Sequence, residues 1–160
     1  MTMMERPYKT VISHLSDLPK YVGRELGLSE WLTITQEDIN VFAKLTGDEQ
    51  WIHVDPVRAG KESPYGTTIA HGFMILSYAS KFSYETLEIG DVRMGLNYGL
   101  DKLRFTSPTP VGSRVRGRVT LLEVEAKPPG VKYKLSIVFE REGQEKPVCV
   151  AEWLAVAYAA

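Results

Sequence analysis

The stretch "IAHGFMILSYASKFSYETL" (residues 69–87) decides the fold. Its apolar residues recur at helical spacing, so we expect a helix that begins near Thr67 or Thr68 and runs to about residue 86. One face carries Ile69, Phe73, Leu76, Ala79 and Phe82, and Met74, Ile75, Tyr78 and Tyr84 cover much of the remainder. A helix that is apolar on almost every side is buried on most of its sides.

The chain after residue 93 has the alternation that predicts strands. In "SRVRGRVTLLEVE" (113–125), Val115, Val119 and Leu121 alternate with three arginines, a pattern typical of a sheet with one solvated face. Segments 93–105, 131–140 and 148–159 also read as strands, with turns such as "KPPG" (127–130) between them. An antiparallel meander must cover its apolar face, and the helix over 68–86 is the obvious partner. We therefore expect an α+β hotdog fold, in which a curved antiparallel sheet wraps around one long central helix.

The N-terminal segment shows two short elements. Residues 16–26 predict a short helix, with Ser16 or Asp17 as its cap and Pro19 in its first turn. "EWLTIT" (30–35) is rich in β-branched and aromatic residues and predicts a strand.

A second helix is expected over residues 36–45. Thr35 followed by Asp38 resembles a capping box, and Gly47 provides a stop signal. The residues expected to be buried are Ile39, Phe42 and Leu45. Residues 48–67 have no clear period, and we expect a long loop with room for one helical turn. A loop of that length in a compact domain is either functional or a misassigned element.

Composition limits the kind of protein. With 160 residues the chain suits one domain (1–160), with a core at about 30–158 and a helical extension before it. A net charge of −1 gives no general attraction to nucleic acid or to anionic membranes. "MTMMERPYKT" is not expected to be a secretory signal, and no apolar run is long enough for a membrane span. The single cysteine, Cys149, cannot form an internal disulfide, which favours a cytoplasmic location, and its apolar neighbours predict a core residue.

"TGDEQWIHVD" (46–55) places Asp48 and His53 five residues apart, and His71 and Gly72 follow in the buried helix. Taken singly, an Asp after Gly47 is often a turn former, and a histidine in apolar sequence is often structural. A metal site from the two histidines and Asp48 is chemically sufficient, but the regular helical spacing of a zinc site is missing. No G-x-S-x-G, G-x-G-x-x-G or P-loop pattern occurs.

The pair of motifs "TGDEQWIHVDP" (46–56) and "YGTTIAHGFMILS" (65–77) resembles the MaoC-like dehydratases. That family includes the (R)-specific enoyl-CoA hydratases and a nodulation-protein-N-like branch. "NYGLDKLRFTSPTPVGSRVR" (97–116) is similar to the same branch, and the resemblance covers roughly residues 30–158. Many members have Asn-Pro where this chain has Gln50-Trp51, and the nodulation-protein-N-like branch shares the Gln-Trp form.

The resemblance implies hydration of a trans-2-enoyl thioester to the 3R-hydroxyacyl thioester, or the reverse dehydration. Asp48 and His53 would hold the water, with His53 as the base because an imidazole titrates near neutral pH. Gly72 would donate its backbone N–H to the thioester oxygen, since it has no Cβ to block approach. His71 is expected to brace this region, and Ser80, Gln50 and Trp51 are weaker candidates for the pocket.

The resemblance also implies no metal and no cofactor, with coenzyme A or an acyl-carrier protein as the carrier of the substrate, and a homodimer formed through the sheet edge. Two alternatives stay open, a hotdog acyl-CoA thioesterase and a non-catalytic acyl-thioester binding protein. Acyl length is undetermined. The basic residues that could meet coenzyme A phosphates are Lys102, Arg104, Arg114, Arg116 and Arg118.

Overall fold

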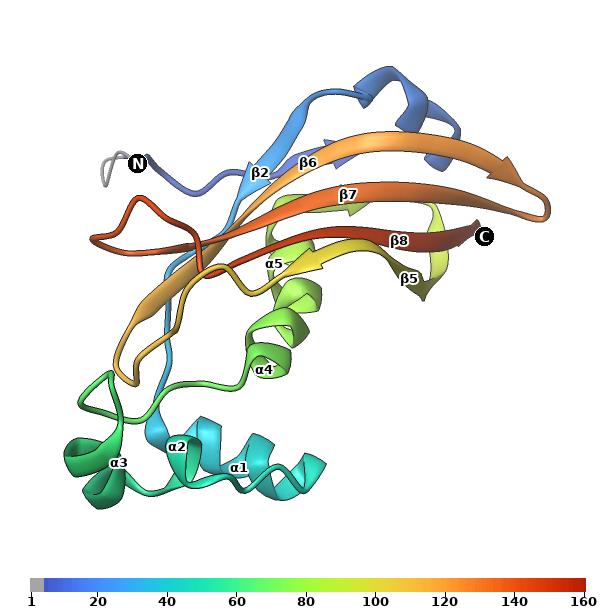
Figure 1. Ribbon diagram of the computed structural model, residues 1–160. Helices are drawn as coiled ribbons and strands as arrows, with labels where there is room; N and C mark the ends of the chain where they lie inside the picture. The colour runs from blue at the N-terminus through green and yellow to red at the C-terminus, as the bar shows by residue number, and fades with distance from the viewer. Residues whose placement is uncertain (1–4) are drawn as a thin grey trace.

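The computed structural model describes residues 5–160, and the expectation for the N-terminal decapeptide lies partly outside them. The elements, in chain order, are β1 (Thr10–Ile12), the 3₁₀ helix η1 (Leu15–Tyr21), β2 (Glu25–Leu28), β3 (Leu32–Thr33), α1 (Gln36–Thr46), α2 (Trp51–Val54), α3 (Pro56–Glu62), α4 (Gly72–Ser77), α5 (Ala79–Thr86), β4 (Leu87–Ile89), β5 (Val92–Arg104), β6 (Arg114–Lys127), β7 (Gly130–Arg141) and β8 (Cys149–Ala159). Figure 1 shows the long strands curving over α4 and α5, with α1, α2 and α3 gathered at one end.

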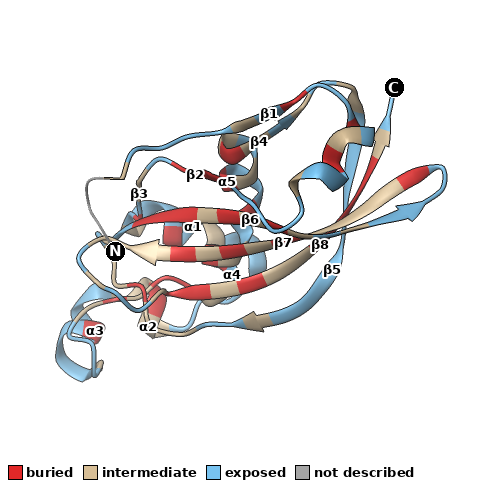
Figure 2. Cartoon of the chain, turned by 90° about the horizontal axis from the view of Figure 1, so that it is seen from above, coloured by how far each residue is buried: buried red, intermediate tan, exposed pale blue. Residues whose placement is uncertain are grey.

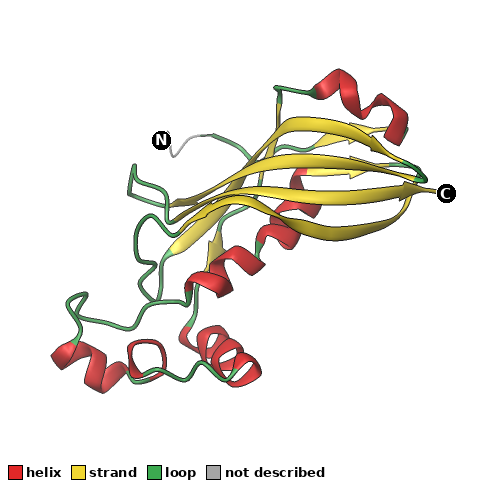
Figure 3. Cartoon of the chain, turned by 45° about the vertical axis from the view of Figure 1, so that its right-hand side comes forward, coloured by secondary structure: helices red, strands yellow, loops and turns green. Residues whose placement is uncertain are grey.

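The large sheet has the strand order β2-β6-β7-β8-β5, with β3 also paired to β6. All of its pairings are antiparallel, and β6, β7 and β8 form the expected meander. Helices α4 and α5 lie on the concave side of this sheet (Figure 3). The expected α+β architecture, an antiparallel sheet wrapped around a helix, is therefore confirmed.

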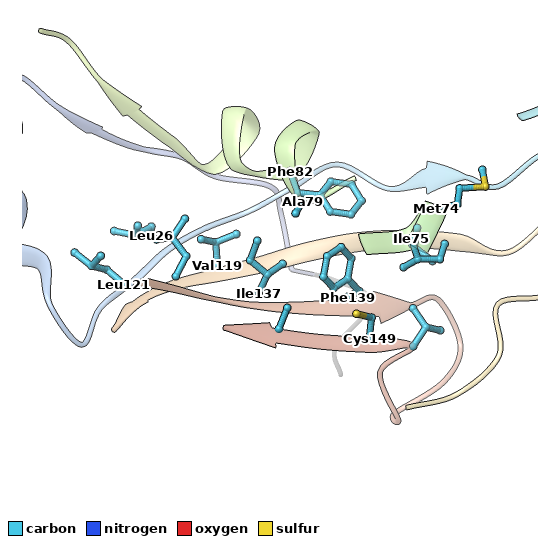
Figure 4. Close-up of a cluster of buried hydrophobic side chains, with 14 of the residues drawn as sticks. Leu26, Met74, Ile75, Ala79, Phe82, Val119, Leu121, Ile137, Phe139 and Cys149 are labelled. Atoms are coloured by element: carbon cyan, nitrogen blue, oxygen red, sulfur yellow. The ribbon is translucent and has the colours of Figure 1, made fainter. Parts of the chain in front are cut away.

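The core forms where the helix meets the sheet (Figure 4). Phe82 of α5 is fully buried against Phe139 of β7, with ring centroids 5.9 Å apart. Gly117 of β6 makes this approach possible, because a Cβ there would lie only 2.7 Å from Phe82. The apolar face predicted for β6 is confirmed, since Val115, Val119 and Leu121 are all buried.

The central helix differs from its prediction. It begins at Gly72 rather than at Thr67 or Thr68, because Ile69 and Ala70 are held as extended chain by backbone bonds to Ile52 and Thr109. It is also divided at Tyr78, whose N–H bonds to the carbonyl three residues earlier, tightening the turn between α4 and α5.

The expectation that this helix is buried on most of its sides is also wrong for the single chain. Phe73 is 67% exposed and Tyr84 is 78% exposed. The buried side instead carries Met74, Ile75, Ala79, Phe82 and Thr86. One side of the central helix therefore faces away from the sheet without cover from the described part of the chain.

Helix α1 forms as predicted. The Thr35 hydroxyl accepts a bond from the Asp38 N–H, and Gly47 ends the helix in the left-handed region at φ 81°. Ile39 is buried and Phe42 packs against the core, but Leu45 is 80% exposed. Its expected burial is wrong because Ala43, four residues after Ile39, completes the inward stripe.

Residues 48–67 are not the long loop that their irregular pattern predicts. They contain α2 and α3. The Asp55 side chain accepts a bond from the Arg58 N–H, and Pro56 occupies the first helical position. Asp55 and Pro56 therefore begin a helix within the segment that was expected to be a loop.

The N-terminal segment is part of the core rather than a helical extension of it. The predicted helix over 16–26 is a 3₁₀ helix that ends at Tyr21, and neither Ser16 nor Asp17 is its cap, since His14 occupies that position. Glu25–Leu28 pairs with β6 instead. Leu15, Leu18 and Leu26 are buried in the common core.

The alternating arginines of β6 predicted a solvated outer face, but this face is only partly exposed to solvent. Arg116 is 1% exposed, bonds to Glu140 at 2.8 Å and lies 4.3 Å from the Trp31 ring. Arg118 pairs with Glu140, Glu25 and Glu5. These two arginines hold the N-terminal segment on the sheet, and their contacts favour a structural role over phosphate binding. Within the described residues, no helix is both long and apolar enough to cross a bilayer.

Candidate active site

Three short segments bring the candidate residues together. Asp48 follows Gly47 at the end of α1, His53 lies on α2, and His71 is the residue that precedes Gly72 at the start of α4. One ligand atom from each of Asp48, His53 and His71 lies within 4.8 Å of the others. The predicted residues therefore converge on one location from separate parts of the sequence.

His53 is 6% exposed, and a hydrogen bond from its ring fixes the orientation of its side chain. Its Nδ1 lies 2.7 Å from the carbonyl oxygen of Ile69. Because a carbonyl can only accept, Nδ1 carries the proton, and Nε2 is left with its lone pair. That Nε2 lies 4.0 Å from Asp48 Oδ2.

His71 contacts both members of this pair. Its ring stacks on His53 with centroids 3.9 Å apart, and its Nε2 lies 2.9 Å from the backbone carbonyl of Asp48. Nε2–H is therefore the donor, and Nδ1 has the lone pair. Among residues 5–160, buried His71 Nδ1 has no hydrogen-bond partner. These contacts fit the bracing role expected for His71.

Asp48 faces solvent more than its neighbours do. Its side chain is 53% exposed, while that of His53 is 8% exposed. Asp48 Oδ1 accepts a long bond of 3.5 Å from the Gln50 N–H. A carboxylate at the edge of a buried imidazole can hold one side of a small polar molecule while the ring holds the other.

Gly72 opens α4 and borders a cavity of about 370 Å³. A Cβ at Gly72 would lie 2.9 Å from the ring of Phe105, which is packed directly against this glycine. The cavity is further lined by Tyr65, Ile69 and Ile75, and by the connection from β5 to β6. As the first residue of the helix, Gly72 has an N–H that α4 itself does not satisfy.

The weaker candidates fall in two places, with Ser80 on α5 and with Gln50 and Trp51 on the segment that joins Asp48 to His53. Ser80 is on α5 and lines a different cavity of about 470 Å³, between that helix and the strands β5, β7 and β8. Gln50 is exposed, and its carbonyl accepts from the His53 N–H. Trp51 lies 4.3 Å from the Arg58 guanidinium. Neither Asp48 nor His53 is among the residues that line these two cavities.

The environment of His53 favours its neutral form. Burial is the main cause that lowers its pKa below the usual 6.5, and neighbouring His71 lowers it further. The bond to Ile69 and the Asp48 carboxylate oppose this shift. A neutral imidazole with a free Nε2 can accept a proton. By contrast, burial raises the pKa of the Cys149 thiol to about 12, which agrees with its expected place in the core.

Asp48, His53 and His71 are also the residues that the sequence offered as possible metal ligands. Two of their four ring nitrogens already bond to carbonyls, which leaves His53 Nε2, His71 Nδ1 and the Asp48 carboxylate. The expectation of a metal-free site stays a prediction.

Sequence reasoning missed the residues that position this site. The Ile69 carbonyl orients His53, Phe105 packs on Gly72, and Gln36 bonds to the backbone of His53 at 2.7 Å. These contacts join residues that are far apart in the sequence, and no local pattern marks them. Of these positions only Gly72 was marked in the sequence, as a residue whose missing Cβ leaves room for a close approach.

Comparison with known proteins places the chain among relatives. The family model described as "MaoC like domain" matches residues 17–137. The 3-hydroxyacyl-thioester dehydratase Z of Mycobacterium tuberculosis (strain ATCC 25618 / H37Rv) is 49% identical over 139 residues, covering 86% of this chain and 91% of that protein. Nodulation protein N of Rhizobium leguminosarum bv. viciae is 44% identical over 146 residues, covering 89% of each. The unliganded R-hydratase PhaJ1 of Pseudomonas aeruginosa has the same fold, with a TM-score of 0.71 at 22% identity over 87% of this chain and 83% of that one.

The lowered pKa of His53 can be measured directly. We expect its ring to be neutral at pH 7 and to titrate below pH 6.5, because burial disfavours the cation. Protonation then favours unfolding, so the stability that the neutral ring contributes is lost as the pH falls below 6.5. Proton NMR titration of its Cε1–H, assigned with His53→Gln, gives the value, and the urea-unfolded chain is the control. A folded-state midpoint at or above the unfolded one would contradict this account.

Proposed function

Because the chain belongs to the MaoC-like dehydratases and is a hydro-lyase, we propose that it adds water to trans-2-enoyl thioesters, or removes it from 3R-hydroxyacyl thioesters, through Asp48 and His53. The observation that carries this proposal is the 4.0 Å separation between Asp48 Oδ2 and His53 Nε2. Hydrogen bonds to water are about 2.8 Å long, so one water molecule can bond to both atoms at once.

The hydrogen-bond pattern supports His53 as the base. With Nδ1–H donated to Ile69, the Nε2 lone pair is the proton acceptor that faces Asp48. The Asp48 carboxylate accepts a hydrogen bond from the second O–H of the water and directs its oxygen at the β-carbon of the substrate. The pair then returns a proton to the α-carbon, so that the elements of one water are added and no net proton is consumed.

Negative charge develops on the thioester oxygen as water adds. Gly72 supports this step because its N–H lies at the first turn of α4, where the helix dipole favours negative charge. The cavity beside Gly72 is lined by apolar and small polar side chains and suits the thioester and its acyl group. Loss of one such donor typically costs about 3 kcal/mol in the transition state.

The carrier of the substrate and the location of the protein in the cell remain predictions. The named relatives include a 3-hydroxyacyl-thioester dehydratase and an R-hydratase. We expect coenzyme A or an acyl-carrier protein to carry the acyl group. A cytoplasmic location is predicted from the single, buried cysteine.

A homodimer is part of the proposal. Strand β5 lies at one end of the sheet order and is exposed along nearly its whole length (Figure 2). An edge strand presents unpaired backbone groups to a partner. Its exposed apolar side chains are Met94, Leu96, Tyr98 and Leu100. A second copy pairing with β5 would cover them.

Activity of two variants tests the proposed pair. Asp48→Asn and His53→Gln should each stay folded and lose hydration of crotonyl-CoA or a longer enoyl-CoA by roughly 10²- to 10⁴-fold, the usual contribution of acid–base groups. The rate is followed as falling absorbance of the conjugated thioester, with Glu49→Gln as the control that removes a neighbouring exposed carboxylate.

The other outcomes separate the alternatives. Wild-type rates in both variants would contradict the mechanism. Release of free thiol from acyl-CoA, detected with a thiol reagent, would indicate a thioesterase. Binding of acyl-CoA without turnover would indicate a binding protein.

Light scattering tests the dimer. The expected mass is twice the 18.0 kDa of one chain. Leu96→Glu on β5 should shift the protein towards monomer, because a charge would have to be buried in the interface. Val41→Glu is the matched control, since Val41 is 62% exposed on α1. A monomeric wild-type protein, or a dimer that is indifferent to Leu96→Glu, would contradict this surface.

A further inference from the structure

The side chain of Gln36 lies between two segments of the candidate site. Its Nε2 lies 2.7 Å from the backbone carbonyl oxygen of His53 and 2.9 Å from Asn40 Oδ1. Its Oε1 accepts a bond of 2.5 Å from the Thr68 hydroxyl. Both amide hydrogens and the amide oxygen are therefore used, and the group has one orientation that satisfies all three partners.

These bonds close a ring around His53. Thr68 directly precedes Ile69, whose carbonyl accepts from His53 Nδ1. The amide nitrogen of Gln36 therefore bonds to the backbone of His53. Its amide oxygen bonds to Thr68, which is the neighbour of Ile69 in the chain. The ring is reinforced by the bond from the Ile69 N–H to the Ile52 carbonyl at 3.1 Å.

Gln36 lies at the start of a helix and beside a buried residue. It is the first residue of α1, directly after the Thr35 cap, and Thr68 is fully buried. Helix α1 also ends just before Asp48, so the element that anchors Gln36 delivers the carboxylate. A displacement of His53 relative to Asp48 would alter the 4.0 Å separation that suits one water molecule.

We propose that Gln36 is a positioning residue for the reaction, which sets the place and the tautomer of His53 through the His53 carbonyl and the Thr68–Ile69 segment. This inference rests on the proposed function of His53. Gln36 bonds to backbone and to neighbouring side chains, so it is expected to act on turnover rather than on substrate affinity.

Glutamine is the residue type that this position requires. The His53 carbonyl can only accept, so an N–H must face it. Gln36→Glu keeps the shape of the side chain but places a carboxylate oxygen against the carbonyl oxygen at 2.7 Å. Only the protonated carboxyl can restore a donor, and it can still accept from Thr68.

Steady-state kinetics of Gln36→Glu tests the proposal. We expect kcat to fall by roughly 10- to 100-fold at pH 8, because small misplacements of catalytic groups have effects of that size. KM should change by less than about threefold, because the substitution disturbs the groups that act in the transition state and leaves the contacts that bind the substrate intact. The ratio of variant to wild-type kcat should rise as the pH falls and the introduced carboxyl is protonated.

Asn40→Asp is the matched control. It adds the same charge one helical turn away and keeps the acceptor for Gln36 Nε2, so wild-type kcat is expected. Thr68→Ser should also retain activity, since it keeps the hydroxyl, whereas Thr68→Val should lower kcat as Gln36→Glu does. Thermal unfolding at each pH verifies that the variants are folded. A loss that follows unfolding alone, or a change confined to KM, would overturn the positioning role.

Failure of the inference is distinguishable from failure of the proposed function. If the wild type hydrates enoyl-CoA and Asp48→Asn does not, wild-type kcat in Gln36→Glu at every pH overturns the role of Gln36. If the wild type has no such activity, the proposed function fails, and the NMR signals of the His53 ring decide the rest. The proposal expects Gln36→Glu to shift those signals and their titration midpoint, while Asn40→Asp leaves both unchanged. Unshifted signals would overturn it without any measurement of turnover.

Discussion

The hydrogen bond from His53 Nδ1 to the Ile69 carbonyl is the interaction on which the site depends. It fixes which ring nitrogen carries the proton, and it ties the helical segment after α1 to the chain that enters the central helix. That entering chain is kept extended by Ile52 and Thr109, so α4 begins at Gly72, next to the stacked rings of His53 and His71. The orientation of the base and the position of the candidate oxyanion donor are thus two results of one arrangement.

Much of the fold could be predicted because its signals are local. Apolar and polar residues alternate along much of β6 and β7, and Thr35, Asp38 and Gly47 mark the two ends of α1. The errors occurred where long-range contacts decide the structure. Periodicity continues through residues 69–71, yet backbone bonds to distant segments keep them out of the helix. Residues 16–26 resembled one helix, but the helix ends at Tyr21 and Glu25–Leu28 pairs with the edge of β6 as a strand.

The candidate site was only partly accessible from the sequence. Asp48, His53 and Gly72 were singled out because their motifs resemble those of the MaoC-like dehydratases, whereas Asp48 and His53 taken singly also suited structural roles. Gln36 was interpreted only as the start of a helix, because the two partners that connect it to the site lie 17 and 32 residues away. From the sequence Phe105 was interpreted only as a strand residue, whereas in the structure its ring packs against Gly72. Residue types reveal which groups can react, whereas the contacts that orient them appear only once the chain has folded.

The state of the His53 ring is the most direct test of this account. In the folded protein at pH 7, ¹⁵N NMR of the imidazole should show a protonated Nδ1 and a bare Nε2, because the Ile69 carbonyl accepts the only ring proton. A ring that carries its proton on Nε2 could not accept one from a water molecule held by Asp48. That result would contradict the central claim, whatever the activity of the protein.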